Sequence, residues 1–135
     1  MPLADYLFYE EPGITLYCGD CREVLPLLAV DKEKQIAAVV TDPPYNVGFS
    51  YASYDDAMDE TSYLVWLNEC FTAAADLLVT PGAFVWFWQG IRVSRGEVLR
   101  VLPPGFVVHH AGAWFKREFA GDLWKGGHPA FSWEP

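Results

Sequence analysis

The sequence has few basic side chains. Its 135 residues include 9 Lys and Arg against 18 Asp and Glu, which gives a net charge of −9. Contacts to phosphate need Lys and Arg, so this balance argues against a general nucleic-acid binder. The shortage is uneven, because residues 1–91 hold 3 basic and 14 acidic side chains, whereas residues 92–135 hold 6 basic and 4 acidic ones. If nucleic acid is a partner, we expect the C-terminal third of the chain to contact it.

Other features are missing altogether. No apolar run approaches the roughly 20 residues of a membrane span, and the N-terminus lacks the basic-then-apolar pattern of a secretory signal. The three cysteines, Cys18, Cys21 and Cys70, cannot form an even disulfide framework. These absences predict a soluble cytoplasmic protein that binds no membrane. Because 52% of the residues are hydrophobic, we expect residues 1–135 to form one folded domain.

The most informative stretch is Thr41-Asp42-Pro43-Pro44-Tyr45-Asn46, which follows the apolar run 36–40. This pattern predicts a buried strand that stops abruptly, because proline donates no hydrogen bond and keeps the preceding residue extended. Ligands of open α/β sheets bind at the carboxyl ends of the strands. A carboxylate and a carbonyl there would accept both N–H bonds of a flat amine while the tyrosine ring stacks on it. The alternative is a rigid turn with no chemical role.

The rest of the chain predicts alternating strands and helices. A strand at 14–17, a helix from Cys21 to about Val30 capped by Asp20, and a strand at 36–41 predict a βαβ unit with parallel strands. The further elements are a loop at 46–60, a helix from a Thr61 cap to about Val79, a doubly buried strand at 83–88, a basic amphipathic helix at 91–102 and a strand at 106–116. The expected fold class is α/β, with a mostly parallel sheet and flanking helices.

The stretch Asp42-Pro43-Pro44-Tyr45 resembles the catalytic motif of DNA amino-methyltransferases, which methylate adenine N6 or cytosine N4. The segments 18–25 and 47–67 are similar to the family's sequences on either side of that motif. The resemblance implies a partial Rossmann-like methyltransferase domain that uses S-adenosylmethionine. It also implies double-stranded DNA as the substrate, with the target base flipped out. Adenine is favoured over cytosine, because the cytosine enzymes more often have Ser at the first motif position.

The resemblance also assigns roles to single residues. Asp42, Pro43 and Pro44 would orient the target amine and localise its lone pair for in-line attack on the sulfonium methyl, while Tyr45 stacks on the base. Asp20 and Asp42 would contact the cofactor. The expected DNA contacts are Asn46, which would also support the active-site loop at 46–60, and Lys116, Arg117 and Lys125 near or within a target-recognition region that starts at 117.

The family's glycine-rich cofactor motif is absent from this sequence, and an apolar segment at 131–135 looks unfinished. We therefore expect a domain truncated at its C-terminus, whose partner is a C-terminal complementing chain or a second copy that covers the exposed sheet edge in a homodimer. Two alternatives remain open. In the first alternative, the chain is an inactive domain that acts through dimerisation or partner binding. In the second, it is a thiol-redox protein built on Cys18-Gly19-Asp20-Cys21. Buried cysteines without chemistry are favoured over a redox pair, and no metal site is expected.

Overall fold

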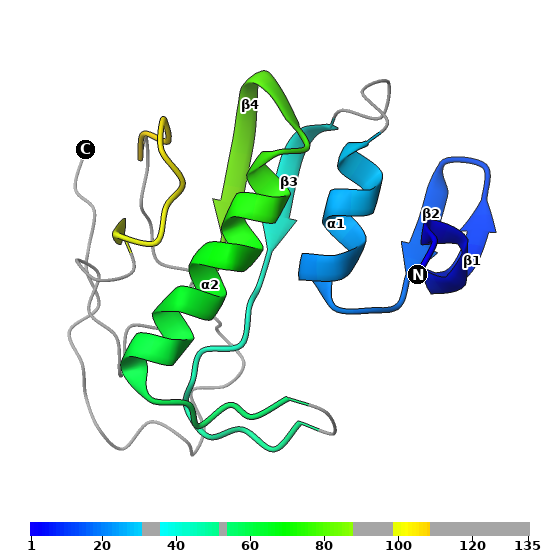
Figure 1. Cartoon of the computed structure of the whole chain (residues 1–135). Coiled ribbons are helices and arrows are strands. Elements are labelled where there is room, and N and C mark those ends of the chain that lie inside the picture. Colours follow the sequence, from blue (N-terminus) through cyan, green and yellow to red (C-terminus); the bar gives the residue numbers. More distant parts are fainter. Residues whose placement is uncertain (31–35, 52–53, 88–98, 109–135) are drawn as a thin grey trace, which may run out of the picture. The chain divides into compact units, whose positions relative to one another are not determined.

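The computed structural model of the chain describes residues 1–30, 36–51, 54–87 and 99–108 (Figure 1). The chain divides into one unit at Met1–Pro104 and a second at Gly105–Pro135. The first unit contains, in order, η1 (Leu3–Tyr6), β1 (Leu7–Glu11), β2 (Ile14–Tyr17), α1 (Cys21–Ala29), β3 (Ile36–Thr41), α2 (Glu60–Ala75) and β4 (Leu78–Trp86). The expected α/β class is confirmed. None of the helices in the described ranges combines the length and the apolarity that a membrane span requires.

The strand at Ile14–Tyr17 forms as predicted, but its partner is β1. The two strands pair antiparallel through the turn at Pro12-Gly13, where Gly13 has a φ of +86° that favours glycine. The predicted βαβ unit of 14–17, 21–30 and 36–41 is therefore wrong. A tight turn joins the two neighbouring strands and favours their antiparallel pairing over parallel pairing with a strand that follows a helix.

The parallel pair is instead β3 with β4, and α2 is part of the connection between them. The register places Ala38 opposite Ala83 and Thr41 opposite Trp86. The predicted helix through Val79 is too long, because α2 ends at Ala75 and Leu78 already pairs with Ile36. The described strands thus form two separate two-stranded sheets, one antiparallel and one parallel, and not one mostly parallel sheet.

The first turn of α2 also differs from the prediction. Asp59, rather than Thr61, caps the helix, because its carboxylate accepts a hydrogen bond from Ser62 N at 3.0 Å. In contrast, α1 begins and is capped as predicted, with Asp20 accepting from Arg22 N at 2.9 Å. Both caps satisfy an amide that has no partner inside its helix.

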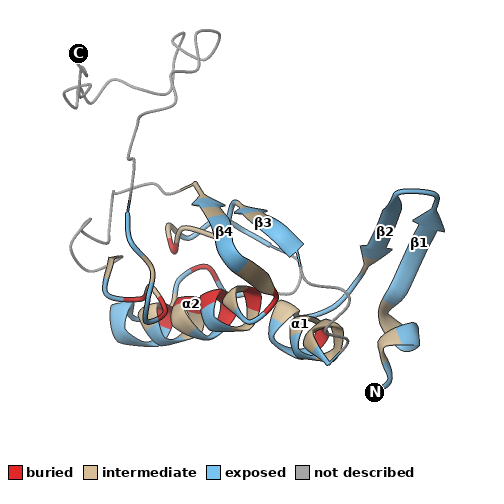
Figure 2. Ribbon diagram, turned by 90° about the horizontal axis from the view of Figure 1, so that it is seen from above, coloured by how far each residue is buried: buried red, intermediate tan, exposed pale blue. Residues whose placement is uncertain are grey.

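The core lies along α2. Its buried cluster consists of Tyr63, Leu67, Phe71 and Val101. Phe71 packs against Phe84 and Trp86 of β4, with ring centroids 5.0 and 5.7 Å apart, and so attaches the helix to the sheet. Figure 2 shows the buried residues concentrated on α2. Trp86 is half-buried and packs against this cluster.

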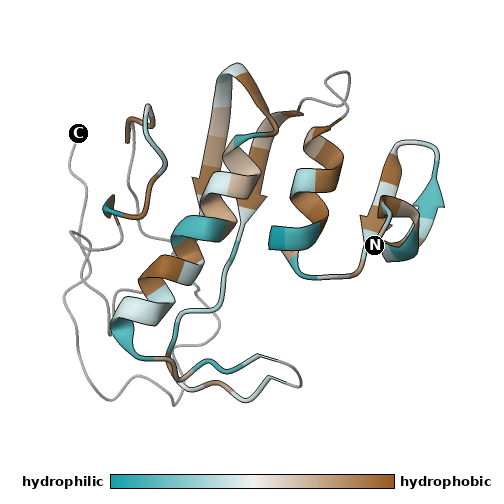
Figure 3. Cartoon of the chain, in the orientation of Figure 1, coloured by the Kyte–Doolittle hydropathy of each residue, from teal (hydrophilic) through white to brown (hydrophobic). Residues whose placement is uncertain are grey.

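Strands β3 and β4 were predicted to be buried, and this prediction is wrong. Val40 is 68% exposed and Val85 is 47% exposed, although both strands are largely apolar (Figure 3). Among the described residues, β3 and β4 form a two-stranded sheet. Parallel strands are normally covered on both faces, so this sheet retains apolar surface that packing usually removes from water.

Several predictions fall wholly or mostly outside the described residues. The basic helix at 91–102 is described only from 99, where Val101 is buried and Leu102 is half-buried. The strand predicted at 106–116 is described only at 106–108, and those residues form no strand. The residues from 109 onward, including His109, His110, Lys116, Arg117 and Lys125, lie outside the described part.

Candidate active site

The Asp-Pro-Pro-Tyr stretch lies at the carboxyl end of the parallel pair, as predicted. The last pairing of β3 is the hydrogen bond from Phe87 N to Thr41 O at 3.0 Å. Asp42 follows directly and is exposed, while Pro43, Pro44 and Tyr45 are half-buried in irregular backbone. The local sequence explains this end of the strand, since neither proline can donate to a ladder. The carboxylate therefore stands beyond the sheet, open to an incoming group.

Tyr45 turns back onto Asp42. Its hydroxyl donates a hydrogen bond to Asp42 Oδ1. Burial and then the hydrogen bond to this carboxylate raise the pKa of Tyr45 to about 12. The phenol thus remains protonated at neutral pH and continues to donate. The two motif side chains that the sequence assigns to one task are in direct contact, and Oδ2 of Asp42 lies outside this bond.

The second proline is tied to α2. Tyr63, which is almost completely buried, donates from its hydroxyl to Pro44 O at 2.9 Å. This bond uses one lone pair of the Pro44 carbonyl and leaves the Pro43 carbonyl outside it. The corner after β3 is therefore held from behind by a side chain of the core. Tyr63 lies in the segment 47–67 that resembles the family, but the sequence predicted no role for it.

Replacing Tyr63 by phenylalanine tests this attachment. We expect Tyr63→Phe to lower the free energy of unfolding by about 0.5–1.5 kcal/mol, because the ring stays while the bond to Pro44 is lost. Tyr9→Phe is the matched control, since the Tyr9 hydroxyl donates to Glu11 at 2.8 Å on an exposed strand. Urea unfolding measures the change in the free energy of unfolding for both variants. Equal losses would mean that the Tyr63 hydroxyl does not hold the corner.

The loop after the motif is organised by Asp56, which is 3% exposed. Its carboxylate accepts three backbone N–H bonds, from Asn46 at 2.8 Å, Val47 at 3.0 Å and Phe49 at 2.8 Å. Its own carbonyl accepts from Gly48 N at 2.8 Å. The backbone thus curls around an anion supplied by the chain itself, as in the anion-binding concavities of successive N–H groups.

Sequence reasoning missed Asp56 and counted it only as one of the acids in the loop. A signal was present in the two residues that most readily accept a left-handed backbone. Asn46 has a φ of +57° and Gly48 a φ of +81°. Such residues close to each other favour a concave run of amides, and a buried run of amides needs an acceptor. An acid later in the same loop was the available one.

Asn46 lies inside this loop. It is 3% exposed, and its Nδ2 donates to Met58 O at 2.9 Å. Within the described residues, its Oδ1 is buried and accepts no hydrogen bond. This placement favours the predicted loop-supporting role of Asn46 over a direct contact with DNA.

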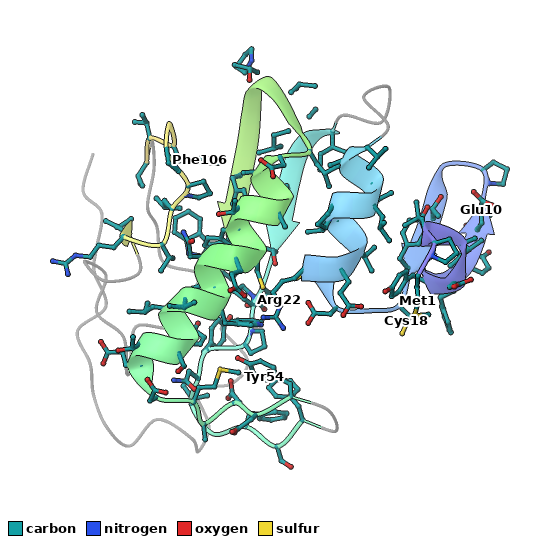
Figure 4. All side chains as sticks on the ribbon, in the orientation of Figure 1. Met1, Glu10, Cys18, Arg22, Tyr54 and Phe106 are labelled. Atoms are coloured by element: carbon teal, nitrogen blue, oxygen red, sulfur yellow. The ribbon has the colours of Figure 1, made fainter. Side chains whose placement is uncertain are left out.

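A row of aromatic rings runs from the loop to α2. Consecutive ring centroids are 4.9 Å apart for Phe49 and Tyr51, 5.9 Å for Tyr51 and Tyr54, and 5.1 Å for Tyr54 and Trp66. Phe49 and Tyr51 are exposed, whereas Tyr54 and Trp66 are half-buried. The row connects the open side of the loop with the core, and Figure 4 labels Tyr54 within it. Burial raises the pKa of Tyr54 to about 12, so its hydroxyl is neutral.

Asp20 lies at the start of α1 and is fully engaged by its neighbour. Arg22 bonds both of its oxygens, at 3.1 Å to Oδ1 and 2.7 Å to Oδ2, and also reaches Glu69 of α2 at 2.9 Å. The hydrogen bonds from Arg22 hold the pKa of Asp20 below its usual value. The cap role of Asp20 is confirmed, and its contact with a cofactor stays a prediction that would require Arg22 to release one oxygen.

A hollow of about 500 Å³ opens beside this ion pair. Its lining comes from the start of α1, the loop and the first half of α2, namely Asp20, Arg22, Tyr54, Met58, Thr61, Ser62, Val65, Trp66 and Glu69. Aromatic walls next to charged groups are typical of sites for flat polar molecules. Within the described ranges, no group of three or more His, Cys, Asp and Glu side chains could hold a metal ion.

Comparisons with known proteins identify the family. The family model for DNA methylases of the N6/N4 type matches residues 36–126, about two thirds of the chain. The type II methyltransferase M.MjaVI of Methanocaldococcus jannaschii is 38% identical over 71 residues, which cover 52% of this chain and 34% of that protein. The type II methyltransferase M.HpaI of Haemophilus parainfluenzae is 29% identical over 76 residues, which cover 53% of this chain and 23% of that protein.

The matched part thus spans about a quarter to a third of the length of these curated relatives. No solved structure matches the chain significantly. The family match begins at the first residue of β3 and includes the motif, the loop and all of α2 and β4. On this match, the chain belongs to the DNA amino-methyltransferases, the family of N6- and N4-type DNA methylases.

Proposed function

We propose that residues 42–45 are the target-base clamp of an S-adenosylmethionine-dependent DNA amino-methyltransferase. The observation that carries the proposal is the pairing of the Asp42 carboxylate with the Tyr45 phenol at the carboxyl end of β3. Oδ2 of Asp42 and the Pro43 carbonyl would accept the two N–H bonds of the exocyclic amine. These bonds keep the lone pair on nitrogen, which then attacks the methyl group of the sulfonium in line.

The base must leave the duplex before it can reach this corner, at a cost of a few kcal/mol. Stacking on an aromatic ring returns about 1–3 kcal/mol of that cost, and Tyr45 is the ring next to the carboxylate. We assign adenine N6 as the preferred target over cytosine N4 from the Asp at the first motif position. The cofactor chemistry is methyl donation, and Asp20 and Asp42 are the residues proposed to contact S-adenosylmethionine. DNA phosphates would meet Lys116, Arg117 and Lys125, in or next to a target-recognition region that starts at 117.

The complete site is expected to need more than this chain. We propose one partial, Rossmann-like catalytic domain over residues 1–135, with 46–60 as its active-site loop. A complementing chain would supply the glycine-rich cofactor motif that this sequence lacks, whereas a second copy of the chain would cover exposed surface of the sheet. The exposed apolar residues of β3 and β4, such as Val40 and Val85, support this proposal, because the faces of parallel strands are normally covered by further packed elements. Such an enzyme would act on DNA in the cytoplasm, as the sequence predicts.

The same surface favours a second candidate, an inactive domain that acts by binding a partner. Calorimetric titration of the 135-residue protein with S-adenosylmethionine, followed by transfer of labelled methyl to unmethylated genomic DNA, separates the two. Saturable binding with transfer, by the chain alone or after its complementing chain is added, is expected for an enzyme. Binding of neither S-adenosylmethionine nor a target-containing strand would leave the partner-binding domain.

The base clamp can be tested without methyl transfer. We expect Tyr45→Ala to weaken binding to a single strand that contains the target base by about 1–3 kcal/mol, because stacking is lost. Tyr45→Phe is the matched control, since it keeps the ring and removes only the hydrogen bond to Asp42. Fluorescence titration with 2-aminopurine in place of the target adenine measures both. Unchanged affinity of Tyr45→Ala would make the ring a structural element only.

A further inference from the structure

We infer that Cys21 and Cys70 form a reactive thiol site that small disulfides convert to a Cys21–Cys70 disulfide between α1 and α2. The inference is independent of the methyltransferase function. Sequence reasoning considered Cys18 and Cys21 as the redox pair, because a Cys-x-x-Cys spacing precedes a helix. In the structure, however, the thiol of Cys21 hydrogen-bonds to that of Cys70.

Two adjacent contacts fix the helices in this register. Cys21 is the first residue of α1, and Cys70 lies in the buried part of α2. The next residue of α1, Arg22, bonds Glu69, the residue of α2 before Cys70, at 2.9 Å. The thiol contact and the ion pair therefore connect the same two turns of the two helices. A disulfide of about 2.05 Å would require the two hydrogen-bonded thiols to approach each other more closely.

Cys18 lies apart from this site. It is exposed, so the prediction of buried cysteines is wrong for this residue. Its backbone N–H donates to Tyr6 O at 2.8 Å, which holds it beside the N-terminal hairpin (Figure 4). Asp20 occupies the cap position between Cys18 and the helix. All three cysteines are free thiols in the structure.

The environment distinguishes the two members of the pair. The hydrogen bond from Cys70 lowers the pKa of the Cys21 thiol, and the Arg22 guanidinium acts in the same direction, while burial and Asp20 oppose them. The same hydrogen bond and burial raise the pKa of Cys70. Cys21 is also the more accessible, being half-buried where Cys70 is buried. Cys21 is therefore the attacking thiol, and Cys70 the resolving one.

The reaction is thiol–disulfide exchange with a small disulfide such as oxidised glutathione. The Cys21 thiolate attacks one sulfur, the small disulfide breaks, and one thiol leaves. Cys70 then loses its proton, its sulfur attacks Cys21, and the second thiol leaves. Two electrons pass from the protein dithiol to the small disulfide, which ends as two thiols. The product links α1 to α2 at residues next in sequence to Asp20, Arg22 and Glu69, which line the hollow.

The test is disulfide mapping of the full chain. The reduced protein is incubated with oxidised glutathione near neutral pH, its free thiols are blocked with N-ethylmaleimide, and peptides are identified by mass spectrometry. We expect a product lighter by two hydrogen atoms, with Cys21 joined to Cys70 and Cys18 blocked. A Cys18–Cys21 link, or glutathione on Cys18 with Cys21 and Cys70 still reduced, would overturn the inference.

Variants test the order of the steps. Cys18→Ser should form the disulfide as the natural protein does. Cys70→Ser should stop at glutathione on Cys21, whereas Cys21→Ser should lose the protein disulfide and leave Cys70 unmodified. Because Cys70 is buried, Cys70→Ala provides a second variant in case serine destabilises the core. Glutathione accumulating on Cys70 in Cys21→Ser, at the rate seen for Cys21, would contradict the assigned order.

Discussion

Asp56→Ala is expected to lower the free energy of unfolding by about 3 kcal/mol or more. The carboxylate accepts three backbone N–H bonds from 46–49 and is almost completely buried. Alanine leaves these three donors without an acceptor, and each unsatisfied donor costs about 1–3 kcal/mol. Urea unfolding followed by circular dichroism gives the difference.

Asp55→Ala is the matched control in the same loop. Asp55 is exposed and its carboxylate accepts one bond, from Ala57 N at 3.0 Å, so its loss should cost less than about 1 kcal/mol. Asp56→Asn separates hydrogen bonding from packing, since it keeps the shape but offers one acceptor oxygen in place of two. It should fall between the other two variants. An Asp56→Ala loss no larger than that of Asp55→Ala would show that the loop does not depend on this carboxylate.

Asp42→Ala is expected to reduce methyl transfer by at least about 100-fold, because the amine loses the acceptor that orients and activates it. DNA affinity should stay nearly unchanged, since base stacking is assigned to Tyr45. The assay is incorporation of labelled methyl into unmethylated DNA, using the form of the protein that transfers methyl, either the chain alone or the chain with its complementing partner.

Asp55→Ala again serves as the control, because it removes an exposed acid of the same loop without touching the corner after β3. Tyr45→Phe separates the two motif side chains, since it frees Oδ1 of Asp42 and keeps the ring. Transfer by Asp42→Ala at the rate of the natural protein would remove the carboxylate from the mechanism. A loss of DNA affinity equal to the loss of transfer would instead assign Asp42 to binding.

Local signals were sufficient where one residue type decides the structure. Asp20 begins α1, and two prolines end β3, because a capping carboxylate and a missing N–H act within a few residues. The position of the motif at the carboxyl end of a strand followed from these signals alone, whereas the parallel partner β4 did not. The resemblance then gave the family, which the family model confirms.

Pairing between distant segments was beyond such signals. Leu78 and Val79 suit the apolar stripe of α2 as well as a strand, and the pairing of Leu78 with Ile36 decides between them. The burial of β3 and β4 was overestimated for a related reason. An apolar run shows that the side chains of a strand can be buried, but it does not show which other element packs on them. Asp56 was missed because its partners are backbone amides, which no side-chain pattern reports.

The buried Asp56 has one further consequence, for the timing of DNA recognition. Residues 46–49 already have their amides bonded, so their conformational entropy is lost when the protein folds and not when DNA arrives. A rigid segment next to the proposed base clamp would lower the ordering cost of association. The slow step at this site would then be the extrusion of the base from the duplex, because residues 46–49 already have their bound conformation.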